Sequence, residues 1–582
     1  MKSCFPFSAE NEANIKHPEN EVKKMIEAKI ISSLENIFPD SAYLTFPEKK
    51  SISVLRNERF TFQLLYTLTP NDNLPNEWCV RFSVTAEGGL AKYATLRTVD
   101  YLPVLLPAYP NVPDDGNYLR RTPGLYPDVL TPLHYGNCAH AVKGQTHAIW
   151  IDVNADGETL PAGVHALALH IVGEDGTDIT REISVDVIDA LLPEQTTKFT
   201  QWFHSDCLSE YYRVPVWSDE HFRIIENFVK CATRNGINML LIPVFTPPLD
   251  TKIGGERPTV QLVDVRKDGG KYSFGFEKLD RFLDLAKRCG IKYYEICHFF
   301  TQWGAQHAPK IMATVDGEYK KIFGWESDAV GEYSDFLRIF IPELLSHMKA
   351  RGEDKKCFFH ISDEPLSEEA IACYTKAKNS IADLLCGYTI MDAVSHYEIY
   401  ERGVLETPIP CNDHIQPFID HGVKNLWTYY CCAQCNGVSN RLISMPSWRN
   451  RSIGMQMYRY NIVGFLQWGY NFYYNRTSVD NVNPYYDLSG DYWVPAGDTC
   501  SVYPGRDGDA LESLRIIVFY EALEDQRAMQ LCESLIGRER TVSELEAAFG
   551  APIVFSDCAR SAAQLERTRE RINALIKEAV SK

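Results

Sequence analysis

Two neighbouring carboxylates, Asp363 and Glu364, directly follow the apolar run Cys357-Phe358-Phe359-His360-Ile361. The apolar run is typical of a buried strand, so the acidic pair is expected at the end of that strand. Adjacent carboxylates repel each other, and one of them therefore tends to keep its proton at neutral pH. A protonated carboxyl beside an ionised one suits acid/base cleavage of a glycosidic bond. An exposed acidic turn is the competing interpretation of an Asp-Glu-Pro sequence.

Polar and aromatic side chains also gather where the other predicted strands end. Aromatic rings stack on the C–H faces of sugars and polar groups bind hydroxyls, so this mixture predicts a sugar-binding pocket. The candidate contacts are His204, His298, Trp303, Tyr429, Tyr430, Trp468, Tyr470 and Asn471. For each aromatic residue, packing at the mouth of a barrel is an equally good interpretation.

The elements that must position these residues fall into two regions. From about residue 43 to residue 187 apolar residues alternate with polar ones, as in the run Phe60, Phe62, Leu64 and Tyr66. This period-two pattern without intervening helices predicts an antiparallel β-sandwich. The segment Leu191 to Thr200 is expected to end this first domain.

Beyond that segment, short apolar strands alternate with helices of period 3.6, which predicts parallel strands with crossover helices. Ser218 is a candidate N-cap, and Gly236 and Gly290 are expected to end two of the helices. Eight candidate strands, near residues 201, 240, 295, 360, 390, 409, 428 and 468, fit a (β/α)8 barrel. The sixth is the weakest, and an open doubly wound sheet is the alternative.

The resulting domain prediction has three parts. Residues 1–195 form the β-sandwich, residues 196–510 form the catalytic barrel, and residues 511–582 form a helical extension packed on the barrel. The acidic segment from Glu521 to Glu533 within this extension is interpreted as a solvated helix face.

Composition limits the partners and the compartment. The chain has 59 Lys plus Arg and 77 Asp plus Glu, a net charge of −18, which argues against nucleic acid and anionic membranes as main partners. No apolar stretch reaches the roughly 18 residues of a membrane span, and the first 24 residues lack a signal-peptide pattern. The 17 cysteines have no framework spacing and are expected to be reduced, so a cytoplasmic location is predicted.

Metal chemistry is the less favoured interpretation of the same residues. His204, Asp206, His298, His360 and Asp363 could serve a barrel metallohydrolase, but they lack tight ligand spacing. The run Cys431-Cys432-x-x-Cys435 lacks a second cysteine pair and is interpreted as small buried thiols. His360, inside an apolar run, is expected to be a hydrogen-bonded core histidine. We therefore predict neither a metal nor a cofactor.

Four motifs in order resemble glycoside hydrolase family 123 over at least residues 201–520. They are GINMLLIPVFTPPLDT (Gly236 to Thr251), HFFTQWGAQHAPK (His298 to Lys310), HISDEP (His360 to Pro365) and FLQWGYNFY (Phe465 to Tyr473). The resemblance implies an exo-acting, retaining β-N-acetylgalactosaminidase that releases terminal β-linked GalNAc from glycans such as those of glycosphingolipids.

The resemblance also implies roles for the acidic pair. In that family the substrate's own 2-acetamido oxygen displaces the leaving group, so Glu364 would be the acid/base and Asp363 would orient the acetamido group. A hydroxyl from Tyr429 or Tyr430 would hold the acetamido oxygen, and strand alternation allows only one of them to do so. Trp468 would form a stacking wall for the sugar.

Two alternatives remain from the sequence. A glycosidase could combine Glu364 as acid with a separate carboxylate nucleophile, such as Glu295 or Asp392. A barrel that binds sugars without cleaving them would keep the aromatic pocket, and the intact acidic pair argues against it.

Overall fold

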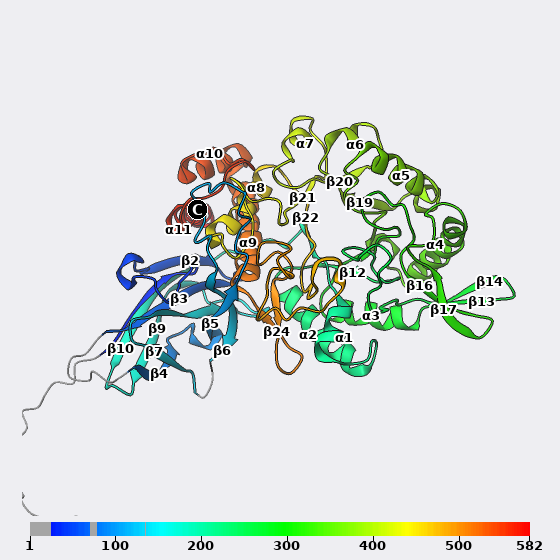
Figure 1. Cartoon of the computed structure of the whole chain (residues 1–582). Helices are drawn as coiled ribbons and strands as arrows, with labels where there is room; N and C mark the ends of the chain where they lie inside the picture. Colours follow the sequence, from blue (N-terminus) through cyan, green and yellow to red (C-terminus); the bar gives the residue numbers. More distant parts are fainter. Residues whose placement is uncertain (1–24, 70–77, 134–135, 582) are drawn as a thin grey trace, which may run out of the picture.

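Two five-stranded sheets form the N-terminal region of the computed structural model, which describes residues 25–69, 78–133 and 136–581 (Figure 1). In spatial order the first sheet contains β1 (Ile26–Ser32), β3 (Phe60–Leu68), β8 (Thr146–Val153), β5 (Ala94–Val104) and β6 (Gly124–Pro132). The second contains β2 (Ser51–Leu55), β10 (Asp178–Ile188), β9 (Gly163–Gly173), β4 (Cys79–Glu87) and β7 (Cys138–Val142).

Residues that alternate along both sheets share one hydrophobic core. Phe62 and Ile151 of the first sheet lie in the same buried cluster as Val84, Leu169 and Ile183 of the second. The prediction that all pairs are antiparallel is wrong for one pair, because β10 runs parallel to β2. These two strands lie more than 120 residues apart, so no hairpin forces them into opposite directions.

Eight short parallel strands form the barrel, and their spatial order follows the chain. The strands are β11 (Lys198–Gln201), β12 (Met239–Ile242), β15 (Tyr293–Ile296), β18 (Cys357–Phe359), β19 (Thr389–Ala393), β20 (Thr407–Ile409), β21 (Trp427–Tyr429) and β22 (Gly464–Gln467). The first strand pairs with the eighth, which rules out the open doubly wound alternative. Between β20 and β21 the pairing reduces to one bridge, Cys411 to Tyr429, so the barrel is nearly closed.

Local sequence signals fix where the barrel elements begin and end. The side chain of Ser218 accepts a hydrogen bond from the backbone N–H of His221 at the start of α2 (Asp219–Arg234). Gly236 and Gly290 have φ of +79° and +99°, the left-handed region that glycine tolerates, and each precedes a barrel strand. At Gly464 a Cβ atom would lie only 2.1 Å from the Trp427 ring, so the eighth strand has to begin with glycine.

Helices of unequal length connect the strands (Figure 1). Besides α2 they are α1 (Ser205–Tyr212), α3 (Glu277–Arg288), α4 (Glu332–Ala350), α5 (Glu368–Asn379), α6 (Tyr397–Glu401), α7 (Gln416–Asp420) and α8 (Ser447–Arg459). The loops after β12 and β15 together build a small sheet in the order β14 (Lys271–Gly275), β13 (Asp264–Asp268), β16 (Ile311–Val315) and β17 (Glu318–Phe323). A long segment after β22 carries β23 (Val502–Pro504) and β24 (Ala510–Glu512).

The C-terminal helices join the barrel to the N-terminal sheets. They are α9 (Leu514–Ile536), α10 (Arg538–Phe549) and α11 (Ala562–Val580). Phe519 of α9 stacks on Phe199 of β11 with ring centroids 4.4 Å apart, so this helix covers the seam between the first and eighth strands. On its other side α9 shares a buried cluster with α11 and with Leu34 and Leu55 of the N-terminal region. The domain boundaries at residues 195 and 510 remain predictions.

The interpretation of the acidic segment of α9 as a solvated face is wrong. Glu521, Glu524 and Asp525 are buried. Asp525 accepts hydrogen bonds from Arg451 at 2.7 Å and from Arg569 at 2.8 Å, which belong to α8 and α11. Arginines from distant parts of the chain thus neutralise Glu521 and Asp525, and these ion pairs join α9 to α8 and α11.

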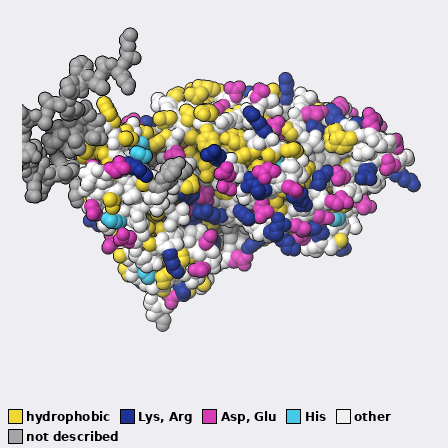
Figure 2. Space-filling model, turned by 90° about the horizontal axis from the view of Figure 1, so that it is seen from below, with side chains coloured by type: hydrophobic (Ala, Val, Ile, Leu, Met, Phe, Trp, Pro, Cys, Tyr) yellow, Lys and Arg dark blue, Asp and Glu magenta, His cyan; other side chains and the backbone are white. Residues whose placement is uncertain are grey.

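The molecular surface mixes charges of both signs. Figure 2 shows acidic and basic side chains interspersed on the face that it presents, with hydrophobic side chains gathered toward the middle. Among the residues that the structure describes, no helix combines the length and the apolar character that crossing a membrane requires.

Candidate active site

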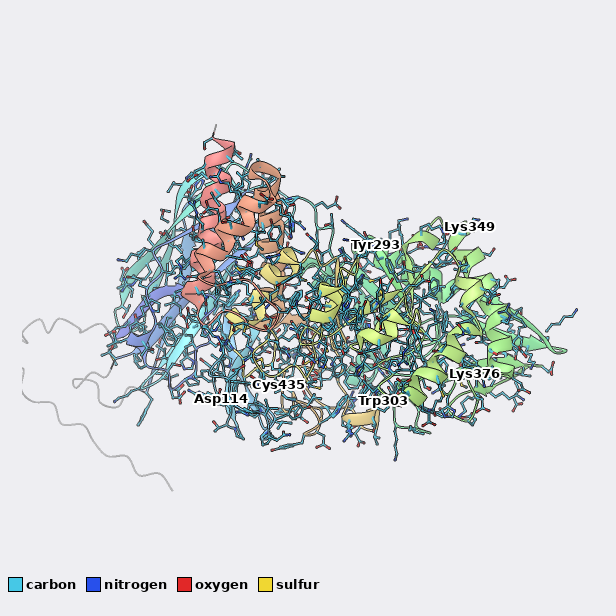
Figure 3. The ribbon with its side chains drawn as sticks, turned by 90° about the horizontal axis from the view of Figure 1, so that it is seen from above. Asp114, Tyr293, Trp303, Lys349, Lys376 and Cys435 are labelled. Carbon is cyan, nitrogen blue, oxygen red and sulfur yellow. The ribbon has the colours of Figure 1, made fainter. Side chains whose placement is uncertain are left out.

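The acidic pair lies at the carboxyl end of the barrel strands. Asp363 and Glu364 follow β18, and both side chains are half-buried. The backbone N–H of Trp303, from the loop after β15, donates to the Asp363 carbonyl at 2.9 Å. Trp303 is 50% exposed, and Figure 3 shows it on the side of the barrel opposite Tyr293, the first residue of β15. Active groups of parallel barrels gather at this end.

The environment of the pair favours protonated carboxyl groups. Burial, followed by the charge of Glu364, raises the pKa of Asp363 well above its usual range. Burial also raises the pKa of Glu364, while a hydrogen bond from the Tyr429 hydroxyl to its Oε1 acts in the opposite direction. The pair therefore retains a proton at higher pH than an exposed acid would, as the sequence led us to expect.

A third carboxylate, Asp250, completes the acidic cluster and was missed in the sequence. It follows β12, and burial raises its pKa to about 7, with Arg257 opposing and Glu364 reinforcing the rise. Its backbone N–H donates to the side chain of Gln302. The only available signal was its place within the motif that ends in Leu249-Asp250-Thr251.

Positive backbone φ angles mark three positions of this cluster. The values are +52° at Asp250, +58° at Trp303 and +38° at Glu364. Non-glycine residues adopt such angles at an energetic cost, and the surrounding structure must hold them in place. Strain of this kind is characteristic of functional sites.

Beneath the acidic pair, His360 is clamped between two fully buried carboxylates. Its Nε2 lies 2.7 Å from Glu295 and its Nδ1 2.9 Å from Asp392. Burial opposes a charge on this ring, but the two carboxylates outweigh burial and raise the pKa of His360 to about 10. The ring is therefore a buried imidazolium, and the prediction of a hydrogen-bonded core histidine is confirmed.

The remaining bonding positions of those two carboxylates are also occupied. Glu295 accepts hydrogen bonds from Thr200 at 2.5 Å and from Trp202 at 2.7 Å. Asp392 accepts hydrogen bonds from the Tyr374 hydroxyl at 2.5 Å and from the backbone N–H of Ile361 at 3.1 Å. Both carboxylates have an exposed fraction of 0%, so neither can reach a sugar.

His298 packs against this imidazolium without a hydrogen-bond partner of its own. Its ring stacks on His360 with centroids 4.3 Å apart, and Trp202 meets its other side edge-on. Neither ring nitrogen has a partner among the described residues, and the side chain is 1% exposed. Burial and the neighbouring His360 charge hold the pKa of His298 well below its usual value, so the ring is neutral.

A second network of hydrogen-bonded side chains holds Trp468 in place. The indole N–H donates to Asp498 at 3.0 Å, and burial raises the pKa of Asp498 to about 6. The backbone carbonyl of Trp468 lies 3.0 Å from Nε2 of His204. His204 in turn contacts Arg257 at 3.2 Å, and this arginine forms a two-point ion pair with Asp206 at 2.7 and 2.9 Å. Asp498 thus holds the half-buried indole, and His204 holds the backbone of the same residue.

The structure separates Tyr429 from Tyr430. The hydroxyl of Tyr429 faces Glu364, whereas that of Tyr430 donates to Asn450 of α8 at 2.9 Å on the outside of the barrel. Tyr470 donates to the Phe228 carbonyl at 2.8 Å, and Asn471 bonds both the N–H and the carbonyl of His204. Tyr430, Tyr470 and Asn471 are fully buried, and their polar atoms bond other protein groups. The prediction that these three residues contact a sugar is therefore wrong.

Metal-ligating side chains converge at two places in the described part of the chain. The first group is His298, His360 and Asp392, with ligand atoms within 4.8 Å. Both nitrogens of His360 already bond carboxylates, so this group does not favour a metallohydrolase. The second group is Cys411, Asp413 and His414. None of the described cysteines forms a disulfide. The Cys431 thiol donates to the side chain of Gln434, and the Cys435 thiol donates to the Cys432 carbonyl.

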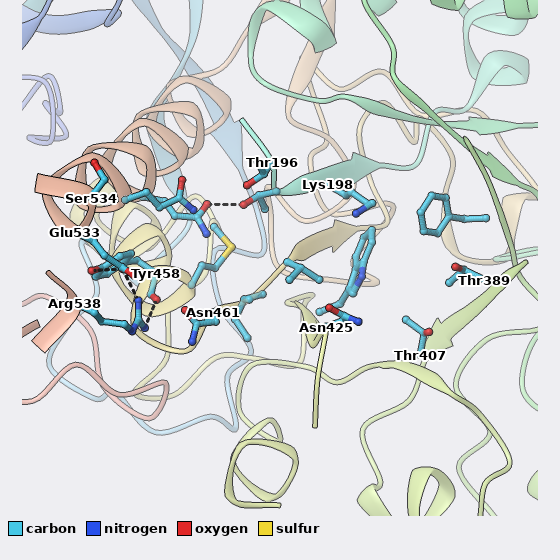
Figure 4. Close-up of a pocket in the computed structure, with 18 residues that line it drawn as sticks. Thr196, Lys198, Thr389, Thr407, Asn425, Tyr458, Asn461, Glu533, Ser534 and Arg538 are labelled. Atoms are coloured by element: carbon cyan, nitrogen blue, oxygen red, sulfur yellow. Dashed lines mark hydrogen bonds and ion pairs between the residues drawn. The ribbon is translucent and has the colours of Figure 1, made fainter. Parts of the chain in front are cut away.

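A cavity of about 800 Å³ lies at the opposite end of the barrel (Figure 4). Its lining includes Lys198, Thr389, Thr407 and Trp427, which are the first residues of four barrel strands. The amino-terminal face of such barrels generally serves stability, and the acidic cluster is at the other face. This cavity, although large, is therefore not the candidate active site.

Comparisons with known proteins agree with this geometry. The family model "Glycoside hydrolase 123, catalytic domain" matches residues 202–532, and the chain belongs to glycoside hydrolase family 123. A family 123 glycoside hydrolase from Clostridium perfringens, studied for glycolipid glycan hydrolysis, has the same fold. Its TM-score is 0.70 at 13% identity, and the match covers 96% of this chain and 99% of that one.

More distant structures match with low scores. A Bacteroides ovatus GH5 xyloglucanase has a TM-score of 0.30 at 8% identity, with 82% of this chain and 98% of that chain covered. A β-D-glucuronidase from Dictyoglomus thermophilum has a TM-score of 0.31 at 8% identity, with 87% and 98% covered. No curated protein matches the chain.

Removing the Tyr429 hydroxyl is expected to raise the pKa of Glu364. The hydrogen bond stabilises the carboxylate form, and such bonds contribute roughly 1.5–3 kcal/mol, equivalent to about 1 pKa unit or more. In Tyr429→Phe the alkaline limb of the pH profile of kcat/KM, which reports ionisations of the free enzyme, should therefore move to higher pH by about 1 unit.

Tyr430→Phe is the matched control, because its hydroxyl bonds Asn450 and not Glu364. Its alkaline limb should coincide with that of the wild type. An alkaline limb of Tyr429→Phe that stays in place, or that moves to lower pH, would contradict the assigned hydrogen bond.

Proposed function

We propose that this protein is an exo-acting, retaining β-N-acetylgalactosaminidase that uses the substrate's acetamido group as nucleophile. The observation that carries the proposal is the half-buried Asp363–Glu364 pair with the Tyr429 hydroxyl on Glu364. Consecutive residues at one turn cannot flank an anomeric carbon from opposite sides, as the two carboxylates of a conventional retaining enzyme do. The pair suits a mechanism in which the substrate supplies the nucleophile, so no protein carboxylate is needed on the face opposite the acid.

The surroundings of the other carboxylates favour the substrate's acetamido group, and not a protein carboxylate, as the nucleophile. Glu295 and Asp392, the sequence candidates for that role, are fully buried and saturated with hydrogen bonds. Asp250 interacts electrostatically with the pair, and burial raises its pKa to about 7, which disfavours the ionised form. A carboxyl nucleophile has to be ionised before it attacks.

In the proposed first step, Glu364 protonates the glycosidic oxygen while the acetamido oxygen attacks the anomeric carbon. The C1–O bond breaks, the leaving group departs as an alcohol, and an oxazolinium ion forms. Asp363 accepts a hydrogen bond from the acetamido N–H and stabilises the developing positive charge. Binding of that N–H favours the carboxylate form of Asp363, which leaves the proton of the pair to Glu364.

In the second step, Glu364 removes a proton from water, which attacks the anomeric carbon and opens the ring of the intermediate. Two successive displacements at one carbon give net retention of configuration. Tyr429 is the candidate donor to the acetamido oxygen, since its hydroxyl already lies at the acidic pair. Trp468 and the half-exposed Trp303 are candidates for stacking on sugar rings. His204 and His298 are not kept as sugar contacts, because both are buried: His204 contacts the Trp468 carbonyl and Arg257, and His298 stacks on His360.

The family and the related structure support the proposed substrate class. The Clostridium perfringens enzyme hydrolyses glycolipid glycans, which supports glycans with terminal β-linked GalNAc, such as those of glycosphingolipids, as substrates here. A barrel that merely binds sugars is less well supported, because burying three carboxyls so that their pKa values rise is an arrangement that catalysis uses.

The substrate prediction is tested with aryl glycosides of β-GalNAc, β-GlcNAc and β-Gal. We expect turnover of β-GalNAc to exceed that of β-GlcNAc, and no significant turnover of β-Gal, which lacks the acetamido nucleophile. Release of the aryl group from each glycoside measures this directly. Equal cleavage of the β-Gal compound would overturn the proposal, and no cleavage of any would favour a binding protein.

The acid role of Glu364 is tested by varying the leaving group. In Glu364→Gln the turnover of glycans with poor leaving groups should fall by about 10²–10⁴-fold, because general acid catalysis typically contributes that much. Turnover of activated aryl glycosides, whose leaving groups need no proton, should fall much less. Glu369→Gln, an exposed acid on α5, serves as the control and should behave as the wild type.

Asp363→Asn provides the contrast to Glu364→Gln. This carboxylate supports the nucleophile and not the leaving group, so its loss should slow good and poor leaving groups to a similar extent. If Glu364→Gln also slowed both substrates equally, the assigned acid role would be wrong.

A further inference from the structure

We propose that Cys411, Asp413 and His414 form a binding site for a zinc-class divalent cation next to the active site. The three residues follow β20 in the segment Cys411-Asn412-Asp413-His414, and their ligand atoms lie within 4.8 Å of one another. Cys411 is buried, whereas the side chains of Asp413 and His414 are 29% and 57% exposed. An ion can therefore reach the site from solvent.

The donor set and its spacing suit zinc. The thiol Sγ of Cys411 lies 3.4 Å from Nδ1 of His414, and that nitrogen lies 2.8 Å from Oδ1 of Asp413. A sulfur at about 2.3 Å and a nitrogen at about 2.0 Å from a tetrahedral Zn²⁺ are separated by roughly 3.5 Å. Nδ1 of His414 and Oδ1 of Asp413 would have to separate from 2.8 Å to roughly 3.3 Å, and water would occupy the fourth position. Mixed sulfur, nitrogen and carboxylate donors select zinc-class ions over Mg²⁺ or Ca²⁺.

Neighbouring groups already orient two of the three ligands. Gln434 donates from its side-chain amide to Oδ1 of Asp413 at 3.1 Å, and its carbonyl oxygen accepts from the backbone N–H of Cys431 at 2.9 Å. The hydroxyl of Ser395 lies 2.9 Å from Sγ of Cys411. These contacts already restrict the ligand side chains, so less conformational freedom is lost when a metal binds.

The site connects directly to the residue that bonds the catalytic acid. Cys411 forms a parallel bridge with Tyr429, and the N–H of Asn412 donates to the Tyr429 carbonyl at 2.9 Å. Ser395 lies 3.5 Å from the Tyr429 hydroxyl, which in turn donates to Glu364. A bound dication would favour the carboxylate form of Glu364 and so inhibit turnover. This second part of the inference rests on the proposed function, whereas the metal site does not.

Binding is tested with Co²⁺, which reports thiolate ligation through a charge-transfer band in the near-ultraviolet. The full chain, freed of metal, should develop this band with one equivalent of Co²⁺ and lose it when Zn²⁺ is added. Cys411→Ser should abolish the band. His414→Gln, at an exposed position, should weaken binding at least by the roughly 10–100-fold that the loss of an outer-shell partner costs.

Cys386→Ser and His140→Gln are the matched controls, because they alter an exposed thiol and an exposed imidazole elsewhere. Both should keep the wild-type band. Circular dichroism of Cys411→Ser checks that it folds, and His414→Gln provides an independent test if it does not. The proposed metal site would be wrong if the wild type showed no band or if both site variants kept it. Loss of the band in Cys386→Ser would also contradict the site.

Zn²⁺ should also inhibit release of the aryl group by the wild type, and His414→Gln should require at least tenfold more Zn²⁺ for the same inhibition. Binding of Co²⁺ without inhibition by Zn²⁺ would contradict the coupling to Glu364 alone. Failure of the wild type to cleave any aryl glycoside would count against the proposed function and leave the spectroscopic test of the metal site intact.

Discussion

Carboxyl groups that are neighbours and are partly withdrawn from water cannot both ionise easily, and the active end of this barrel is organised around that fact. Burial and mutual repulsion raise the pKa values of Asp363 and Glu364, and Asp250 adds a third acid to the same cluster. The Tyr429 hydroxyl and the His360 imidazolium offset part of this cost. The pair therefore keeps a proton at higher pH than exposed carboxyl groups would.

This balance requires a rigid support, and fully buried polar groups supply it. His360 bonds Glu295 and Asp392 on either side, and those carboxylates accept four further hydrogen bonds, from Thr200, Trp202, Tyr374 and the backbone N–H of Ile361. Breaking one partner of a buried ion pair typically costs about 3–5 kcal/mol, so the side chains beneath the acidic pair cannot rearrange freely. The positive φ of Glu364 can be maintained because the turn is held from below.

Much of this architecture could be predicted from local sequence patterns. Most barrel strands lie in short, largely apolar segments, and glycines such as Gly236 and Gly290 mark the helix ends, so all eight strands were found. The acidic pair was found because it directly follows such a run. Signals of this kind depend only on residues close together in the chain.

Features that depend on distant partners could not be predicted in the same way. Asp250 and Asp498 lie in irregular loops, where no periodicity reveals which side chains turn toward the site. Glu521 and Asp525 of α9 have the sequence pattern of exposed acids, and only folding brings Arg451 and Arg569 to them. Whether Tyr429 or Tyr430 faces inward depends on the orientation of β21, and Tyr470 and Asn471 lie on a segment that leaves the barrel wall.

The central claim is that the substrate's own amide oxygen forms the bond to the anomeric carbon. The most direct measurement compares turnover of aryl β-GalNAc glycosides whose N-acetyl group carries zero, one, two or three fluorine atoms. Fluorine withdraws electrons from the amide oxygen, so turnover should fall steeply and steadily with each substitution. Rates that do not depend on the number of fluorine atoms would mean that a protein carboxylate, and not the substrate, is the nucleophile.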